Sequence, residues 1–198
     1  METTKEKILS AALELFSTAG YEGTSMQDIA KRLGLTKAAL YRHFTGKEAL
    51  FDALIVSARN HYEQGLHQKD PPHTPSSLRE LEEMSLAQIR FTIEDETVIR
   101  MRRLFSISQY RNPEIAALAD EYFHCGIERA YTAIFAEMAK QGLIRCEDPA
   151  LLAMEYASPI GELIRTVDRE PQKKEEAMAR IRHFIARFLA TFGTEQPT

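Results

Sequence analysis

Residues 24–50 of the 198-residue chain read TSMQDIAKRLGLTKAALYRHFTGKEAL, and their pattern is the most informative about how the N-terminal region folds. Its pattern predicts a helix of about nine residues, a tight turn at Leu-Gly-Leu, a second short helix and the capped start of a third. Ile29 and Leu33 lie four residues apart, as do Leu40 and Phe44, so each pair shares one face of its helix. Two short helices joined by such pairs form a helix-turn-helix.

Packing those four side chains inward turns a polar face of the second helix outward. That face carries Lys37, Ala38, Tyr41, Arg42 and His43, and Ala39 lies between the two sets. Small residues early in a helix let its backbone approach base edges, while Lys, Tyr, Arg and His side chains can donate hydrogen bonds to phosphates. Because alanines make only apolar contacts, for instance with a thymine methyl, Lys37 and Arg42 must supply much of any direct readout. The pattern therefore predicts contact with duplex DNA.

The composition of the whole chain indicates an all-α protein. It holds 24 alanines and three valines, whereas strands favour β-branched residues. The Gly, Pro and capping residues that separate the amphipathic runs divide the chain into about nine helices. Of these, the helix at 113–141 is the longest and most apolar, and we expect it to be central. The expected ranges are 4–18, 25–33, 36–44, 47–66, 77–94, 96–111, 113–141, 149–168 and 173–192.

Charge and hydropathy exclude several classes of protein. The net charge is −4, but residues 1–50 carry +1 and the remainder −5, so an anion is expected to bind near the N-terminus. No apolar run reaches about 18 residues and no signal peptide is visible, which predicts a cytoplasmic protein without a membrane span. The two cysteines, Cys125 and Cys146, form no CxxC pair and are expected to be reduced thiols.

Residues from about 4 to 60 resemble the DNA-binding domain of the TetR (tetracycline-repressor-like) family of bacterial transcription regulators. The resemblance implies a helix-turn-helix domain at 1–46, extended by the start of the fourth helix to about 62, and a ligand-binding and dimerisation domain at 47–198. The matching pieces are Ile8-Leu-x-Ala-Ala12-x-x-Leu-Phe16, Gly20-Tyr21-x-x-Thr24-Ser25-x-x-Asp28-Ile29-Ala30, Leu33-Gly34-Leu35 and Leu40-Tyr41-x-His43-Phe44-x-x-Lys47-Glu48-x-Leu50.

The resemblance also implies roles for individual residues at the DNA. Thr36 would cap the recognition helix, and the residues facing the major groove would be Lys37, Ala38 and Ala39. Phosphate contacts would come from Thr24 or Ser25, and from Tyr41, His43 and Lys47. Arg42 lies where the family varies, so it reads either a base or a phosphate. For His43, interaction with a helix dipole is an alternative role.

For the larger domain, the resemblance implies a small-molecule effector and a homodimer formed through the helices near 149–168 and 173–192. Such a dimer would bind a near-palindromic operator, most simply as a repressor that the effector releases. The candidate effector contacts are Gln88, Arg102, Tyr122 and His124. No cofactor or metal is expected, because the adjacent His124 and Cys125 point apart on a helix.

Three other interpretations fit part of the sequence. The 24–50 segment could be an ordinary helical hairpin with solvated charges, or the chain could be a helical module that binds protein. An enzyme would have to use a buried carboxylate such as Glu155 or Glu162. It would lack a nucleophile elbow, a phosphate-binding glycine loop and an HExxH pair, so no catalytic residue is assigned.

Overall fold

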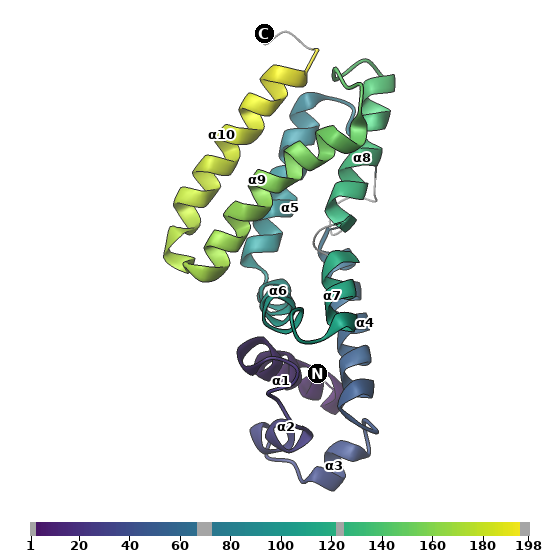
Figure 1. Cartoon of the computed structure of the whole chain (residues 1–198), viewed down its shortest axis with the longest axis vertical. Coiled ribbons are helices and arrows are strands. Elements are labelled where there is room, and N and C mark those ends of the chain that lie inside the picture. The colour runs from purple at the N-terminus through teal and green to yellow at the C-terminus, as the bar shows by residue number, and fades with distance from the viewer. Residues whose placement is uncertain (1–2, 67–72, 122–124, 195–198) are drawn as a thin grey trace. The chain divides into compact units, whose positions relative to one another are not determined.

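The structure, a computed structural model, describes residues 3–66, 73–121 and 125–194 (Figure 1). These residues form ten α-helices and a 3-10 turn, which confirms the all-α class. Within these ranges the only strand-like pairing is an isolated bridge between Ile144 and Gly193. The chain divides into two compact units, Met1–Gln68 with Asp95–Ala119 and Lys69–Glu94 with Asp120–Thr198.

The first unit contains six helices. They are α1 (Thr4–Ala19), α2 (Met26–Arg32), α3 (Lys37–Tyr41), α4 (Lys47–Leu66), α6 (Glu96–Ser108) and α7 (Pro113–Ala119). Helix α1 packs against α2, α4 and α6, and α7 packs against α6. The side chains at the centre of this unit are fully buried; they include Ile8, Phe16, Ile29, Leu40, Leu50, Leu104 and Ile115.

Gly20 allows the end of α1 to lie close to α6. Its φ of +77° is a conformation that other residues rarely adopt, and a Cβ there would lie 3.1 Å from Ile107 Cγ2. The next amide, the N–H of Tyr21, donates to Ser108 Oγ at 3.1 Å. The helix that opens the chain is therefore joined to one that begins about ninety positions later.

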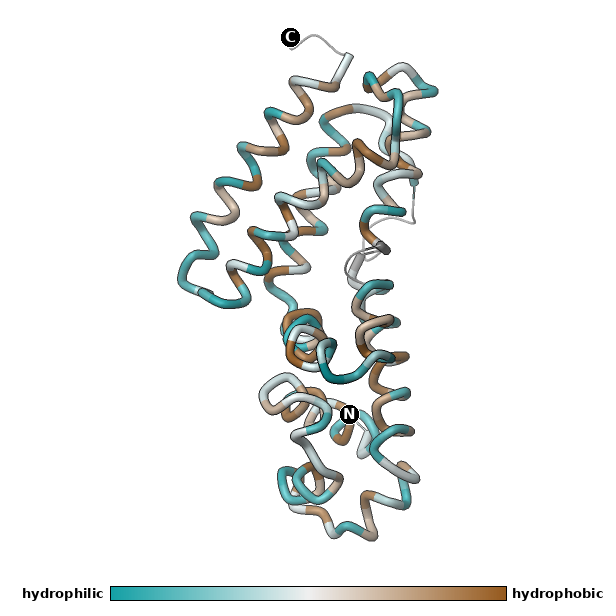
Figure 2. The backbone as a smooth tube through the Cα atoms, in the orientation of Figure 1, coloured by the Kyte–Doolittle hydropathy of each residue, from teal (hydrophilic) through white to brown (hydrophobic). Residues whose placement is uncertain are grey.

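The second unit contains α5 (Leu78–Glu94), α8 (Cys125–Lys140), α9 (Pro149–Arg169), the turn η2 (Pro171–Lys173) and α10 (Lys174–Phe192). Helix α9 packs against α8, α10 and α5, and apolar residues recur at helical intervals along it (Figure 2). The core is strongly aromatic: Tyr131, Phe135, Tyr156 and Phe188 form ring pairs whose centroids lie 4.7–5.7 Å apart. Such tilted, edge-on and stacked contacts stabilise a core beyond the area that they bury.

The loop between α8 and α9 is tied to the end of α10. The N–H of Arg145 donates to the carbonyl of Phe192 at 2.7 Å, and the N–H of Thr194 donates to the carbonyl of Leu143 at 3.1 Å. These bonds satisfy backbone groups at the C-terminal end of α10, where a helix leaves its last carbonyls without partners.

The expected single helix at 113–141 is wrong. Helix α7 ends at Ala119, a π-helical pair follows at 120–121, and α8 begins at Cys125. Helix α7 packs against α6 in the first unit and α8 packs against α9 in the second. Apolar residues at helical spacing show that a face is buried but not which neighbour buries it, so two helices that serve different cores can give one continuous pattern.

Candidate nucleic-acid interface

Helices α2 and α3 form the predicted helix-turn-helix. Ile29, Leu40 and Phe44 are buried and Leu33 is half-buried, so the apolar pairs pack inward. Between the helices the chain turns at Gly34, whose φ is +67°, and the N–H of Leu35 donates to the carbonyl of Ala30 at 2.9 Å. A glycine in this left-handed conformation ends α2 without steric cost.

Both helices begin at side-chain caps. Ser25 Oγ accepts from the N–H of Asp28 at 3.2 Å, and Asp28 Oδ2 accepts from the N–H and the hydroxyl of Ser25 at 2.9 and 2.6 Å. The hydrogen bonds from Ser25 lower the pKa of Asp28. Thr36 Oγ1 accepts from the N–H of Ala39 at 3.1 Å and so caps α3. A cap matters most for a helix as short as α3, because few internal hydrogen bonds support it.

The outward face of α3 holds most of the predicted DNA contacts. Tyr41 is 41% exposed, and the ammonium of Lys37 lies 5.7 Å from the centre of its ring. Ala39 is half-buried beneath them. The face therefore offers cations and hydroxyl donors around a small apolar centre. Its exposed residues are Lys37, Ala38, Tyr41, Arg42 and His43.

The two candidates at the start of α2 lie in different surroundings. Thr24 is 3% exposed, and its hydroxyl donates to the carbonyl of Gly20 at 3.0 Å. Ser25 is exposed and caps α2. Only Ser25 of the pair is exposed, but its hydroxyl already donates to Asp28 Oδ2 at 2.6 Å. Either side chain would therefore have to exchange an internal hydrogen bond in order to donate to a phosphate.

Lys47 lies at the first position of α4 and points into the unit. Its ammonium donates to the carbonyls of Tyr21 at 2.9 Å and Thr24 at 3.2 Å, and lies 4.3 Å from the centre of the Tyr21 ring. An ammonium has three N–H donors, so two are used within the protein. Lys47 thus connects the start of α4 to the turn between α1 and α2.

One cation beside this interface was not identified from the sequence. Lys5 in the first turn of α1 is exposed, and its ammonium lies 5.5 Å from the centre of the Phe44 ring, just beyond α3. The sequence did not indicate this contact, because 39 positions separate the two residues and helical periodicity relates only residues a few positions apart. Arg32 of α2, by contrast, pairs with Glu14 through three nitrogen–oxygen contacts of 2.9, 3.0 and 3.3 Å, which neutralise its charge.

The candidate effector residues are distributed along the chain. Gln88 lines a cavity of about 150 Å³ between α5, α8 and α9 of the second unit. Arg102 is buried in α6 of the first unit. Tyr122 and His124 lie outside the described residues.

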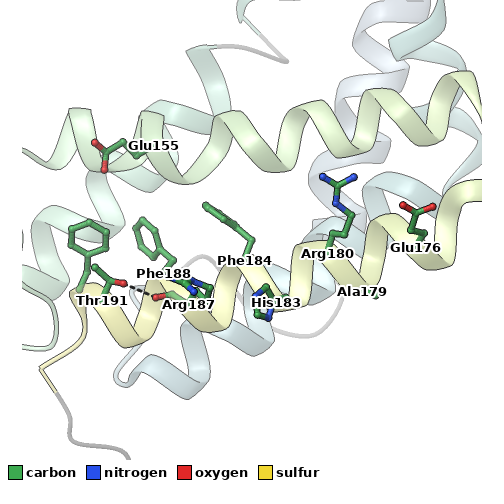
Figure 3. A pocket seen from close by; sticks show the side chains of 10 residues that line it. Glu155, Glu176, Ala179, Arg180, His183, Phe184, Arg187, Phe188 and Thr191 are labelled. Carbon is green, nitrogen blue, oxygen red and sulfur yellow. Dashed lines mark hydrogen bonds between the residues drawn. The ribbon is translucent and has the colours of Figure 1, made fainter.

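A larger groove of about 680 Å³ follows α10 where it faces α9 (Figure 3). Phe184 and Phe188 project from α10 towards α9, and Glu155 lies on α9 opposite them. Next to Glu155 along α9, Leu151 and Met154 are 48% and 46% exposed. The groove and these side chains form an apolar face, rimmed by charge, on the two helices predicted to dimerise.

The described residues offer neither a metal site nor a membrane-spanning helix. No three His, Cys, Asp or Glu side chains lie together as metal ligands would within the described ranges. None of the helices described is both long and apolar enough to cross a bilayer.

Comparison with known proteins gives matches to the N-terminal region and to the fold. A family model described as "Bacterial regulatory proteins, tetR family" matches residues 8–54. The biofilm operon icaADBC HTH-type negative transcriptional regulator IcaR of Staphylococcus aureus (strain Newman) is 46% identical over 51 residues, 26% of this chain and 27% of that protein. IcaR of Staphylococcus epidermidis is 38% identical over 58 residues, 29% of this chain and 31% of its own. The chain thus spans about a third or less of the length of these curated relatives.

Solved structures match nearly the whole chain. A putative TetR-family transcriptional regulator from Mesorhizobium loti MAFF303099 gives a TM-score of 0.68 at 24% identity and covers 96% of both chains. The flavonoid-responsive regulator FrrA gives 0.67 at 24% identity and covers 97% of this chain and 98% of its own. A transcriptional regulator from Rhodococcus sp. Rha1 gives 0.72 at 18% identity, over 98% and 100%. At these identities the similarity establishes the fold. The family itself is matched by the N-terminal region: residues 8–54 match the tetR family of bacterial regulatory proteins.

Proposed function

We propose that this protein is a sequence-specific DNA-binding repressor that acts in the cytoplasm as a homodimer and is released from its operator by a small molecule. The observation that carries the proposal is the outward face of α3, where Lys37, Tyr41, Arg42 and His43 are exposed while Leu40 is fully buried. A short helix with buried apolar residues behind and hydrogen-bond donors in front is suited to enter the major groove. The name of IcaR, a negative transcriptional regulator, supports repression.

In this proposal the phosphate and base contacts are divided among several side chains. Tyr41, His43 and the remaining N–H of Lys47 contact phosphates, and Ser25 does so by exchanging its hydroxyl bond to Asp28 for one to a phosphate. Lys37 and Arg42 reach base edges beside the small side chains of Ala38 and Ala39. Lys5 adds a cation at the edge of the face. The protein acts by binding rather than by catalysis.

The dimer forms through α9 and α10. The groove of about 680 Å³ on α10 and the exposed Leu151 and Met154 on α9 support this part of the proposal. A two-fold axis there gives each protomer the same contacts and places two copies of α3 on one duplex. The operator is then near-palindromic, with half-site centres about one turn, roughly 34–36 Å, apart.

Selection of bound sites from random duplex DNA by the purified full chain tests the proposal. We expect enrichment of one near-palindromic sequence, and binding to it that weakens steeply as salt rises, because phosphate contacts release counterions. A mixed-sequence duplex of equal length is the control. Equal affinity for both duplexes, or an enriched sequence without two-fold symmetry, would contradict the proposal.

A further inference from the structure

The cavity of about 150 Å³ in the second unit is lined by side chains from α5, α8 and α9. Most of its lining is apolar or carries an uncharged polar group. Two charged residues also line it: Arg165 is exposed and pairs with Glu162 at 2.9 Å, while Glu128 is half-buried. The uncharged polar side chains are Gln88, Thr92, Tyr131, Tyr156 and Ser158.

Tyr156 brings an unusual polar group to this cavity. The residue is fully buried. Ser85 and Tyr131 lie near its hydroxyl, but no group of the described residues meets it in hydrogen-bonding geometry. Burial raises the pKa of Tyr156, so the hydroxyl keeps its proton. A buried hydroxyl without a partner is costly, because it has left water without replacing the hydrogen bonds it made there. A site that holds such a donor therefore favours a ligand with an acceptor.

A second group in the cavity can accept a hydrogen bond from a ligand. The hydroxyl of Tyr131 lies 3.0 Å from Ser85 Oγ and 3.4 Å from Gln88 Oε1. It has a single proton, which it can give to only one of them, and the shorter contact is with Ser85. While Tyr131 donates to Ser85, the amide oxygen of Gln88 can accept from another donor. A ligand group that accepts a hydrogen bond from Tyr156 and donates one to Gln88 would therefore satisfy both residues. A hydroxyl can do both.

The volume of the cavity and the charges around it limit which ligands can bind. A cavity of about 150 Å³ holds a molecule as large as benzene, whereas drug-sized ligands occupy roughly 300 Å³ or more. The Tyr131 and Tyr156 rings, whose centroids lie 4.7 Å apart, offer aromatic surface. An anion would lose its hydration without gaining a buried cation, because Arg165 is exposed and already paired.

We propose that this cavity binds a monocyclic phenol, whose hydroxyl accepts a hydrogen bond from Tyr156 and donates one to Gln88. The inference deepens the proposed function, since it names the chemical class of the effector. Binding of the phenol can nevertheless be measured without DNA.

The test is titration of the purified 198-residue chain with phenol, toluene, benzoate and 2-naphthol by calorimetry or ligand-observed NMR. We expect phenol to bind roughly 2- to 10-fold more tightly than toluene, the contribution of one net hydrogen bond. Benzoate and 2-naphthol should bind more weakly than phenol, because one is charged and the other has a second ring. Equal binding of phenol and toluene, or tighter binding of benzoate or naphthol, would overturn the proposal.

Two tyrosine variants form a matched pair. Tyr156→Phe removes the hydroxyl without a partner, so the variant should keep or raise the wild-type Tm and lose the preference for phenol over toluene. Tyr131→Phe breaks the 3.0 Å bond to Ser85 and should lower Tm. If Tyr156→Phe lowers Tm as much as Tyr131→Phe, the hydroxyl has a structural partner and the inference fails.

A third variant fills the cavity without touching either tyrosine. Gly161 lines it, and a Cβ there would lie 3.5 Å from Arg165 Nη1, an ordinary contact. Gly161→Val should therefore retain the helical circular dichroism and abolish phenol binding; unchanged binding would place the ligand elsewhere. DNA titrations on the same preparations separate the two proposals. Phenol binding without specific DNA binding overturns only the repressor, and specific DNA binding without phenol binding overturns only this inference.

Discussion

The ammonium of Lys47 holds the turn between α1 and α2 against the start of α4. Two carbonyl contacts, at 2.9 Å to Tyr21 and 3.2 Å to Thr24, and the Tyr21 ring beneath it make this side chain part of the fold. These two carbonyls leave its third N–H for another acceptor, and we expect that acceptor to be a phosphate, so that one residue serves both stability and DNA binding. Its contribution to stability can be measured without DNA, and its contribution to binding can be measured by titration with DNA.

Lys47→Met keeps the aliphatic chain and removes the charge. We expect the free energy of unfolding in urea to fall by about 1–3 kcal/mol, the contribution of hydrogen bonds from a charged donor. The slope of log affinity for DNA against log salt should also become shallower by about 0.9, one phosphate contact. Lys31→Met is the control, because Lys31 is exposed and loses the same charge; equal stability of the two variants would refute the structural role.

The residues on the outer face of α3 should separate into two classes in DNA titrations. Tyr41→Phe removes a phosphate donor and should weaken binding to all sequences about equally. Lys37→Ala and Arg42→Ala should instead relax the preference at particular base pairs, by ~1–3 kcal/mol for a good bidentate contact. Measuring each variant against the selected operator and its single-base substitutions tests this assignment. Wild-type affinity and preference in all three would show that α3 does not read the DNA.

At the scale of helices, α9 and α10 carry two kinds of apolar residue. Ile181, Phe188 and Leu189 are buried within the protomer, where Phe188 packs 4.7 Å from Tyr156 between ring centroids. A charged substitution at Phe188 would therefore damage the fold before it could test the dimer. Leu151 and Met154 are about half exposed and suit that test better.

The double variant Leu151→Glu/Met154→Glu should sediment as a monomer at micromolar concentration and keep its helical circular dichroism. Like charges meeting across a two-fold axis repel, and an apolar interface loses affinity when charge is buried in it. Val56→Glu in α4 is the control, because Val56 is 58% exposed and lies in the other unit. A wild-type protein that is already monomeric, or a double variant that remains dimeric, would exclude this interface.

The start of α5 should make stability depend on acid pH. Glu80 accepts from the N–H and hydroxyl of Ser76, both at 2.6 Å, and lies 2.7 Å from His73 Nε2. These contacts, the Ser76 hydroxyl first, lower the pKa of Glu80 to about 2 in the folded protein. Because the folded value lies below the unfolded value near 4.5, the carboxylate stabilises the fold above that pH, and its contribution is lost as the pH falls from 4.5 towards 2.

Urea unfolding of Glu80→Gln at pH 6 and pH 3 checks this dependence. The variant should be less stable than the wild type at pH 6, and the difference should shrink at pH 3. Glu83→Gln removes an exposed carboxylate that pairs with Arg79 at 2.9 Å and serves as the control. A Glu80→Gln deficit that is the same at both pH values would show that ionisation of Glu80 is not responsible.

At the scale of the whole molecule, two copies of α3 related by a two-fold axis should require a fixed operator spacing. Inserting about five base pairs between the half-sites turns them to opposite faces of the duplex, whereas about ten restores the face at a greater separation. We expect the five-pair insertion to reduce affinity to that of a single half-site. Titration of the spaced duplexes measures this, and an affinity that is insensitive to spacing would contradict paired binding.

Local signals in the sequence were enough to predict the helix-turn-helix, but not the grouping of the helices. Thr36 and Gly34 act on neighbours within a few positions, so the cap and the turn could be read directly from their spacing. The inward direction of Lys47 and the proximity of Lys5 to Phe44 depend on contacts between distant segments, which periodicity does not encode. The break after Ala119 was missed for the same reason.

The packing of α1 on α6 makes the first unit discontinuous along the chain. A fragment cut after residue 62 would keep the helix-turn-helix but leave α1 without the helix that covers it, including the buried Leu104 and Phe105. Transplanting this DNA-binding region into a chimeric regulator would therefore require the segment Asp95–Ala119 as well. Evolutionary exchange of effector domains would be restricted in the same way, since a single crossover near residue 62 would break one cooperative folding unit.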